Sequence, residues 1–340
     1  MDKRMTIKKI AELAGVSSAT VSKVLNSKGR YSEETRKKVL ELVEKYDYRP
    51  NAVAKSLRTR KSKTIGIIVP DITNEFFAKI VLAIENYCNP LGYSVFICNS
   101  DENEEKELHY FKELELKGVD GLIYLSGNDR LFKERTHMPI VCIDRKPNLD
   151  HIAVVTSDNY HGGYLAGNEL LQNDCERILL IRDYRTTFTT EERVSGFIQA
   201  MKEGNVEVDE RHTVPVEVGI DQSRVAVASL MEQGKFDFDG IFATTDWLAF
   251  GALLALREHG INVPNDVKLI GYDDISLAKY TELSSIYQDT EKLGARAAEQ
   301  LLKMFDKGLL RENNVITIPV ELVSRGSTQN REGKLEEIGK

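Results

Sequence analysis

Cysteine is scarce in this chain, and its four cysteines stand singly, at Cys88, Cys98, Cys142 and Cys175. There is no CxxC pair, and no histidine lies at a spacing that would complete a metal site with one of them. We therefore expect the cysteines to act as small buried hydrophobic residues. The sequence predicts no disulfide framework, no bound metal and no cofactor.

Long apolar runs are also absent. No stretch approaches the ~18 apolar residues of a membrane span, and residues 1–9 are charged where a signal peptide would be apolar. We expect a cytoplasmic protein with no membrane partner. Short-period repeats and low-complexity tracts are missing too, and the polar stretch 329–340 is expected to be a frayed tail.

The motifs of common α/β enzymes are lacking as well. Gly162, Gly163 and Gly167 do not have the GxGxxG spacing of a dinucleotide site. Neither a GxxxxGK[ST] phosphate loop nor a GxSxG nucleophile elbow occurs. We therefore expect a protein that is not an enzyme.

The chain does have a strong separation of charge. Residues 1–63 hold 17 Lys and Arg against 7 Asp and Glu, a net of +10, and the remainder holds 29 against 46, a net of −17. Because phosphate repels an acidic body, this asymmetry indicates that DNA is bound through the basic N-terminal segment. Affinity for DNA should fall steeply as salt is raised.

The basic segment begins with the pattern of a helix-turn-helix domain, which we assign to residues 1–49. It predicts helices at about 7–14, 18–26 and 32–45, with Thr6 and Ser17 as N-caps and Gly15 at the sharp corner. Their small core is expected to contain apolar residues at helical spacing: Ile10, Leu13, Ala14, Val21, Val24, Leu25, Val39, Leu40 and Val43.

Residues 50–62 are expected to form a hinge helix or linker. The segment is basic and has only a few small apolar residues besides Leu57. A short helix of this kind is marginal alone in water, so it needs a partner to form.

From residue 63 onward, apolar runs alternate with amphipathic helices. Strands are expected at 65–69, 95–98, 122–125, 140–143, 178–181, 241–243 and 269–271. This alternation predicts an α/β core of parallel sheets flanked by helices, and the number of units suits two lobes with a cleft between them. We assign 63–328 to this core, with an N-lobe at about 63–160 and 290–317 and a C-lobe at about 161–288 and 318–328.

Several of these segments resemble the LacI/GalR (lactose/galactose repressor) family. The runs IKKIAELAGVS at 7–17 and ATVSKVLN at 19–26 are similar to its helix-turn-helix, and YRPNAVAKSL at 48–57 looks like its hinge. The runs IGIIVP at 65–70 and GYDDI at 271–275 resemble strands of its core, which is like a periplasmic sugar-binding protein. The resemblance implies a dimer that binds a pseudo-palindromic DNA operator under the control of a small effector.

The resemblance also implies which residues read DNA. Ser18, Ala19 and Lys23 occupy base-facing positions of the recognition helix; the alternative is that they are ordinary solvated residues. The other implied contacts, to phosphate and elsewhere on DNA, are Thr6, Ser17, Thr20, Ser22, Asn26, Tyr31, Asn51, Ala54 and Arg58. Lys23 stands where Arg is common in the family, and because lysine lacks the planar fork, looser base discrimination is expected.

Leu57 is a leucine on a short basic helix that has no core of its own. The family uses this leucine as a minor-groove wedge, and two copies would pry open a central base step at a cost of roughly a few kcal/mol. The alternative is that Leu57 packs under the core domain.

Polar and aromatic side chains follow the predicted strands at their carboxyl ends, where such folds bind ligands. Aromatic rings can stack on a sugar face, while carboxylate and guanidinium groups bond vicinal hydroxyls. We reason that Phe76 and Phe77, being adjacent, cannot both face one core. The candidate effector residues, which resemble the set of pentose-binding members of the fold, are Asn74, Phe76, Phe77, Asp144, Arg145, Arg193, Thr245, Asp273 and Gln288.

One position departs from that set. Many relatives have Asn where Thr245 stands, so an amide is missing from the predicted site. We expect the next residue, Asp246, to cap the helix that follows.

The function that these residues predict is a regulator, most simply a repressor of a carbohydrate-utilisation operon that a sugar such as ribose releases from DNA. Alternatives are a corepressor-dependent regulator that responds to a sugar phosphate, a purine or a phosphocarrier protein, and a soluble sugar-binding protein without a regulatory role. The last would have no use for a helix-turn-helix. Few leucines at heptad spacing follow Arg325, so a homodimer is expected rather than a tetramer.

Overall fold

The computed structural model describes residues 5–27, 29–48, 61–125, 136–144, 152–307 and 314–329. Its internal contacts divide the chain into two units, Met1–Ser62 and Lys63–Lys340. Five predicted contact residues, Asn51, Ala54, Leu57, Arg58 and Arg145, lie outside the described residues.

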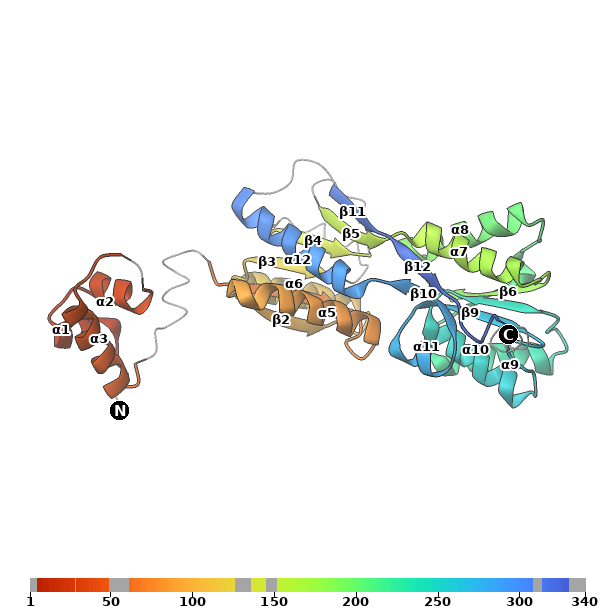
Figure 1. The fold of residues 1–340 in the computed structure, drawn as a ribbon, viewed down its shortest axis with the longest axis horizontal. Coiled ribbons are helices and arrows are strands. Elements are labelled where there is room, and N and C mark those ends of the chain that lie inside the picture. The colour runs from red at the N-terminus through yellow and green to blue at the C-terminus, as the bar shows by residue number, and fades with distance from the viewer. Residues whose placement is uncertain are drawn as a thin grey trace, which may run out of the picture. The chain divides into compact units, whose positions relative to one another are not determined.

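The first unit contains the helices α1 (Ile7–Ala14), α2 (Ser18–Leu25) and α3 (Glu33–Lys45) (Figure 1). α1 and α2 begin where Thr6 and Ser17 each accept a hydrogen bond from the backbone N–H three residues later. At the corner between them Gly15 has φ of 69°, which glycine adopts with little strain. The predicted helix-turn-helix is therefore confirmed.

The core of this unit is smaller than the sequence suggested. Ile10, Val21 and Val39 are fully buried, and Tyr48 packs with them. The expectation that Leu13 and Leu40 belong to the core was wrong, because they are 39% and 40% exposed. Successive helix residues point about 100° apart, so Leu40 cannot share the inward direction of Val39.

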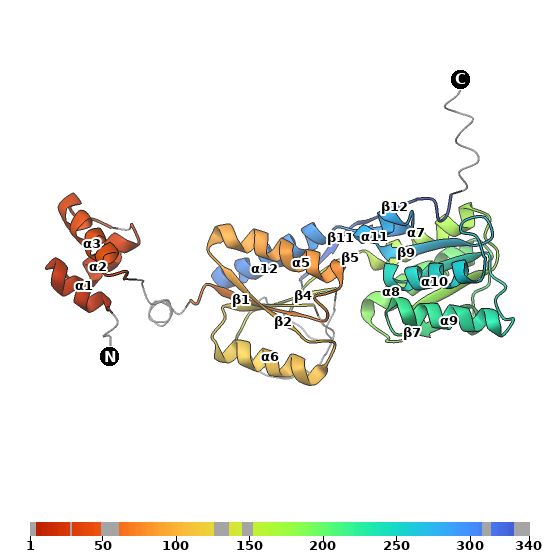
Figure 2. The same cartoon turned by 90° about the horizontal axis from the view of Figure 1, so that it is seen from below.

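The second unit begins with a lobe built on one parallel sheet (Figure 2). Its strands run in the order β11 (Asn314–Ile318), β5 (Ala153–Ser157), β4 (Ile140–Ile143), β3 (Gly121–Tyr124), β1 (Thr64–Val69) and β2 (Ser94–Asn99). α5 (Glu75–Cys88) and α12 (Thr290–Lys307) cover one face, and α6 (Glu104–Leu116) covers the other. A 3-10 turn, η1 (Asn89–Leu91), follows α5.

The second lobe has a sheet of the same kind with one antiparallel strand. The order is β12 (Val320–Val323), β10 (Ser284–Gln288), β9 (Lys268–Asp273), β8 (Gly240–Ala243), β6 (Ile178–Asp183) and β7 (Thr213–Val216), with β12 antiparallel to β10. α7 (Asn159–Gln172) and α8 (Phe188–Glu203) pack on one face, and α9 (Ile220–Glu232) and α10 (Asp246–Glu258) lie on the other. Two short helices, η3 (Glu210–His212) and α11 (Ser276–Tyr280), complete the lobe.

The two sheets explain the apolar runs in the sequence. Leu180 packs under α7 and α8, whereas its neighbours Leu179 and Ile181 belong to the cluster on the opposite face. Because both faces are covered, consecutive residues of one strand are all buried. The predicted two-lobed α/β core is confirmed.

Within the described residues the chain passes between the lobes at β5 to α7, at β10 to α12 and at β11 to β12. The backbone N–H of Asp158 donates to Ile318 O at 2.8 Å, which ties two of these passages together. The carboxyl ends of β5 and β10 therefore lie where the lobes meet.

The lobes also touch through side chains away from these passages. Ser276, at the start of α11, donates from its backbone N–H to Glu75 Oε1 at 2.9 Å and from its hydroxyl at 2.5 Å. Lys79 pairs with the same carboxylate. On another side, Arg185 forms an ion pair with Glu102 of the N-lobe. Contacts of this kind hold the lobes in one arrangement.

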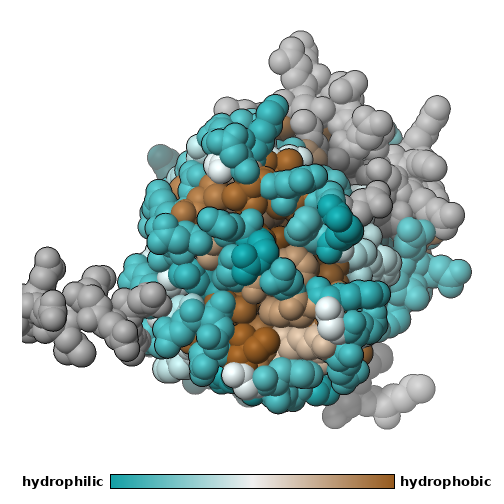
Figure 3. Space-filling model, turned by 90° about the vertical axis from the view of Figure 1, so that its right-hand side faces the viewer, coloured by the Kyte–Doolittle hydropathy of each residue, from teal (hydrophilic) through white to brown (hydrophobic). Residues whose placement is uncertain are grey.

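The far end of the C-lobe is covered mainly by hydrophilic residues, with hydrophobic residues between them (Figure 3). None of the helices in the described ranges is long and apolar enough to cross a membrane.

Candidate effector site and DNA-reading surface

Close helix packing places Arg193 in the core-facing turn of α8. A Cβ atom on Gly163 of α7 would lie 1.9 Å from Arg193 O, and one on Gly196 of α8 would lie 1.8 Å from Tyr160 O. Glycine at both positions lets the two backbones touch. Arg193 is the sixth residue of α8, and its side chain is buried.

The guanidinium of Arg193 is held by partners from several elements. Nε donates to Asn159 Oδ1 at 2.8 Å, and Nη1 donates to Thr244 O at 2.7 Å. Nη1 also lies 3.4 Å from Asp273 Oδ1, and the guanidinium carbon lies 3.7 Å from the centre of the Tyr272 ring. Hydrogen bonds, an opposite charge and an aromatic face therefore fix its position.

Asp273 ends β9 with an unusual backbone, at φ of 107°. Its Oδ1 accepts a hydrogen bond from Gln288 Nε2 at 2.7 Å. Burial raises the pKa of Asp273 to about 7, although Arg193 and the bond from Gln288 act in the opposite direction. This carboxyl group therefore titrates close to neutral pH.

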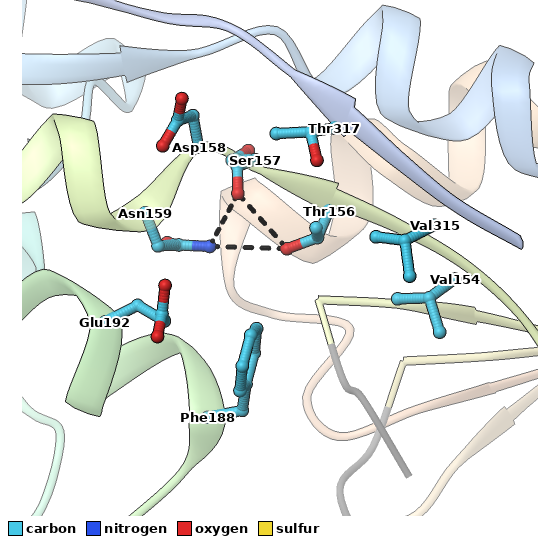
Figure 4. Close-up of a pocket in the computed structure, with 9 residues that line it drawn as sticks. All are labelled: Val154, Thr156, Ser157, Asp158, Asn159, Phe188, Glu192, Val315 and Thr317. Atoms are coloured by element: carbon cyan, nitrogen blue, oxygen red, sulfur yellow. Dashed lines mark hydrogen bonds between the residues drawn. The ribbon is translucent and has the colours of Figure 1, made fainter. Parts of the chain in front are cut away.

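The N-lobe contributes Asp144, just after β4. Its Oδ1 accepts from Thr156 Oγ1 and from the backbone N–H of Ser157, both at 3.1 Å. Asn159 Nδ2 donates to Thr156 Oγ1 at 3.4 Å and to Ser157 O at 3.1 Å (Figure 4).

These bonds join into one chain of contacts across the lobes, which we call the interlobe polar chain: Asp144, Thr156, Asn159, Arg193, Asp273 and Gln288. It joins four of the predicted effector residues, Asp144, Arg193, Asp273 and Gln288. Thr156 and Asn159 also belong to it and were not predicted from the sequence. The signal was the polar run Thr-Ser-Asp-Asn after Ala153-Val154-Val155, at the end of a strand that was not predicted.

Several buried polar side-chain atoms have no protein partner. In the described part of the molecule they are Ser157 Oγ, Thr244 Oγ1, Trp247 Nε1, Tyr272 Oη and Gln288 Oε1. Gln288 bonds Asp273 through its other amide atom, and the Tyr272 ring lies against Arg193. Buried polar groups are ordinarily hydrogen-bonded, so a polar ligand that reached these atoms could supply the missing partners.

The predicted aromatic pair lies at the start of α5. Asn74 caps this helix, accepting from Phe76 N at 3.0 Å. Phe76 is buried, Phe77 is partly buried, and their rings meet edge to face with centres 5.3 Å apart. The inference that neighbouring rings cannot face one core was wrong, since both pack on the same cluster.

The capping expectation for Asp246 was also wrong. Thr245 is the N-cap of α10 and accepts from Leu248 N at 3.3 Å. Asp246 is fully buried and accepts from Ile275 N at 2.8 Å and Ser285 Oγ at 2.6 Å. Burial and the nearby Asp273 raise its pKa well above the usual range. Asp246 thus braces the loop that follows Asp273.

On the DNA-reading surface, Ala19 and Lys23 are exposed and Ser18 is half-buried. Other predicted contacts also hold their own helices together. Thr20 Oγ1 lies 3.0 Å from Ser17 Oγ, and Asn26 Nδ2 donates to Ser22 O at 2.6 Å. Thr6 is exposed and Tyr31 half-buried.

Comparisons with known proteins agree with this geometry. Residues 6–51 match the model of bacterial regulatory proteins of the lacI family, and residues 62–325 match that of periplasmic binding proteins and the sugar binding domain of the LacI family. The HTH-type transcriptional repressor PurR of Aliivibrio fischeri (strain MJ11) is 34% identical, covering 96% of this chain and 99% of its own length. The ribose operon repressor of Halalkalibacterium halodurans is 36% identical, covering 96% and 98%.

A similar solved structure is that of a LacI family transcriptional regulator from Enterococcus faecium with bound ribose. It is 30% identical with a TM-score of 0.70, covering 78% of this chain and 98% of that chain. Both the helix-turn-helix and the two-lobed core therefore have family counterparts, and the chain belongs to the LacI family of DNA-binding transcriptional regulators.

Proposed function

We propose that this protein is a cytoplasmic repressor, without enzymatic activity, that an uncharged sugar such as ribose releases from its operator. The observation that carries the proposal is the interlobe polar chain with its unpartnered neighbours Tyr272 Oη, Thr244 Oγ1 and Gln288 Oε1. A ligand with several hydroxyls would complete these hydrogen bonds and contact both lobes at once. The ribose-binding relative supports the same class of effector.

The charges around the interlobe polar chain favour a neutral sugar over a sugar phosphate as the effector. Arg193 is the cation of the described cluster, and its guanidinium is already matched by Asp273, Asn159 and Thr244 O. Asp144 adds a further buried carboxylate. A phosphate group would meet these carboxylates at short range, where repulsion is strong.

We propose that DNA is read by Ser18, Ala19 and Lys23, with the remaining predicted contacts on DNA, and that Leu57 acts as the minor-groove wedge. The net charge of +10 over residues 1–63 supports this assignment. The domain limits of 1–49, 50–62 and 63–328 are part of the proposal, and protease cleavage within 50–62 that leaves both flanking parts intact would support them.

A homodimer is supported by exposed apolar side chains on unit 2. Leu82 of α5 and Phe96 and Ile97 of the edge strand β2 are each about half exposed, and Tyr280 of α11 is 81% exposed. Exposed apolar side chains of this size suit contact with a second copy of the chain. Sedimentation at low concentration should show a dimer, and Ile97→Glu should shift it toward monomer.

The direct test is thermal unfolding of the full chain with free sugars, their phosphates and purines, combined with operator binding. A ligand at 100 times its Kd adds about 2.7 kcal/mol of stability. A shift with a free sugar that also weakens operator binding supports the proposal. A shift only with a purine or a phosphate ester, or tighter operator binding with the sugar, rejects it.

A further inference from the structure

The ion pair of Arg185 with Glu102 joins the lobes on the side of the sheets opposite to the chain passages. The passages use β5 and β11 at one edge of the N-lobe sheet, and β10 and β12 at one edge of the C-lobe sheet. Glu102 follows β2 at the other edge of the first sheet, and Arg185 follows β6, next to the other edge of the second. A rotation of the lobes about the passages would therefore separate these two side chains more than residues near the passages.

The C-lobe fixes the position of Arg185. Its Nε donates to both carboxylate oxygens of Asp183 at 3.0 Å, and its Nη2 donates to Oδ2 at 2.7 Å. The backbone N–H of Arg185 also donates to Asp183 Oδ1 at 3.0 Å, and Asp183 is buried at the end of β6. Ion pairs at a surface contribute little partly because ordering both side chains costs entropy. Here Asp183 has already ordered the guanidinium, so pairing its Nη1 with Glu102 costs less.

Arg185 lies among carboxylates from both lobes. Burial lowers the pKa of Arg185 from its usual value, and the negative charge of Glu217, just after β7, acts in the opposite direction. Without Arg185, Glu102 of the N-lobe would face Asp183 and Glu217 of the C-lobe, and like charges repel. The arginine thus converts a repulsive contact between the lobes into an attractive one.

Glu102 stands in a tight turn that does not favour glutamate. Asn103 N donates to Ser100 O at 3.0 Å, and the two residues between them, Asp101 and Glu102, have φ of 56° and 53°. Positive φ at both central positions is typical of a type I′ turn, which prefers glycine, asparagine and aspartate there. Strain of this kind is retained where other contacts compensate for it, and the ion pair with Arg185 is such a contact.

We propose that Glu102 and Arg185 form an electrostatic latch, which holds the two lobes in the arrangement of this structure and thereby favours effector binding. Neither residue belongs to the interlobe polar chain, so the latch acts by favouring one arrangement of the lobes and not by contacting the effector. The effect on the effector rests on the proposed sugar-responsive function, whereas the effect on the lobes does not.

The first test measures the arrangement of the lobes in the full chain without any ligand. Spin labels are attached at Leu116→Cys of α6 and Val225→Cys of α9, both of which are exposed positions. Cys98→Ala removes the partly exposed cysteine, and the other three are buried. Labelled protein is mixed with excess unlabelled protein, so that a dimer carries labels on one subunit.

The parent should show mainly one distance between the labels. Glu102→Asn should add a population at longer distance, and Arg185→Gln should add a larger one, because it leaves carboxylates of the two lobes facing each other. Asparagine suits the turn, so Glu102→Asn should not lower the midpoint of thermal unfolding by disturbing the fold of this segment.

Glu105→Gln is the matched control. It removes the same charge from the nearby start of α6, whereas the ion pairs of Arg185 within the described ranges are with Glu102 and Asp183. Unchanged label distances in both Glu102→Asn and Arg185→Gln would overturn the latch. Equal effects of Glu105→Gln and Glu102→Asn would also overturn it, because the general charge of this surface would then be responsible.

Calorimetry of the same proteins with ribose tests the effect on the effector. The Kd for ribose should rise about two- to fivefold in Glu102→Asn and stay at the parent's value in Glu105→Gln. Longer label distances with unchanged ribose affinity would show that the latch does not control effector binding. If ribose binds to none of the proteins, ribose is wrong as the effector, and the label distances alone decide whether the latch holds the lobes.

Discussion

At the scale of single residues, Arg193 contacts several elements of the C-lobe at once. It reaches Asn159, Thr244 O and Asp273 together. Lysine has no planar fork and cannot hold these partners at once. We expect Arg193→Lys to weaken effector binding at least about tenfold, since a hydrogen bond to a charged group contributes about 1.5–3 kcal/mol.

Operator affinity without effector should stay within about twofold in Arg193→Lys, and calorimetry beside an operator titration measures both. Arg182→Lys is the matched control, because Arg182 pairs with Glu191 and is not a member of the interlobe polar chain. Unchanged effector affinity in Arg193→Lys would remove this residue from the site.

The pKa of Asp273 predicts a dependence of stability on pH. Its folded-state pKa of about 7 lies above the ordinary value of about 4, so the folded protein keeps a proton that the unfolded chain has released. The stabilisation is fully present below about pH 4 and is lost as pH rises through 7. Between pH 5 and 8 the free energy of unfolding should fall by about 2.6 kcal/mol more in the parent than in Asp273→Asn.

Urea unfolding of both proteins at the two pH values measures this difference. Asn imitates the protonated carboxyl and tolerates positive φ, so the variant should fold. Parallel changes in the two proteins would mean that Asp273 is already ionised at pH 5.

The residues that could not be predicted from the sequence were missed for one physical reason. Asp144, Asp273 and Gln288 could be named because charged or amide side chains at strand ends seldom serve packing alone. Asn159 and Asp246 have equally strong polarity, but each has an ordinary role available as a helix-start residue. Only the fold shows that Asn159 meets Arg193, 34 residues away, and that Asp246 meets Ser285.

At the scale of elements, the contact of α7 with α8 positions the site. A methyl group at Gly196 would overlap Tyr160 O, and backbone cannot yield as a flexible side chain can. We expect Gly196→Ala to separate the helices, to destabilise the protein by about 1–3 kcal/mol, and to weaken effector binding by displacing Arg193. Thermal unfolding and calorimetry measure the two effects.

Gly204→Ala serves as the control for that variant. There the new methyl group would meet the side chain of Leu171, which can move. If both glycine variants lose stability equally, close backbone packing is not what makes Gly196 necessary.

The contact of α5 with α11 should hold the lobes in the observed arrangement. Glu75→Gln weakens the acceptor for Ser276 and removes the partner of Lys79. Because partly exposed ion pairs contribute about 0.2–1 kcal/mol, effector affinity should fall about two- to fivefold. Glu85→Gln, on the same helix, is the control, and tighter effector binding in Glu75→Gln would show that the contact opposes closure.

The predictability of each strand depended on its surroundings. β1, β6 and β8 could be predicted because both faces of each are covered and each contains a run of apolar residues. β7 and β11 alternate between partial burial and exposure, and β5 ends in Thr-Ser, so none of them gives a long apolar run. The positions of these strands are explained by how each complete sheet is assembled, and not by their local sequence pattern.

At the scale of the whole molecule, operator and effector must affect each other reciprocally. If the effector weakens operator binding by some factor, the operator weakens effector binding by the same factor, because both ligands act on one conformational equilibrium. For a typical coupling of about 1–3 kcal/mol this factor is roughly 5–150. Calorimetry of the effector with and without saturating operator measures it directly.

Repeating this calorimetry at several salt concentrations distinguishes the binding properties of the two units. Operator affinity should fall steeply between low and moderate salt, because the basic unit, net +10 over residues 1–63, displaces counterions from phosphate. Effector affinity should change little, because its site is built from buried groups of unit 2. A steep salt dependence of effector binding in the absence of DNA would instead indicate a charged effector. The proposal of a neutral sugar effector would then be wrong, while the DNA-binding role of the basic unit would stand.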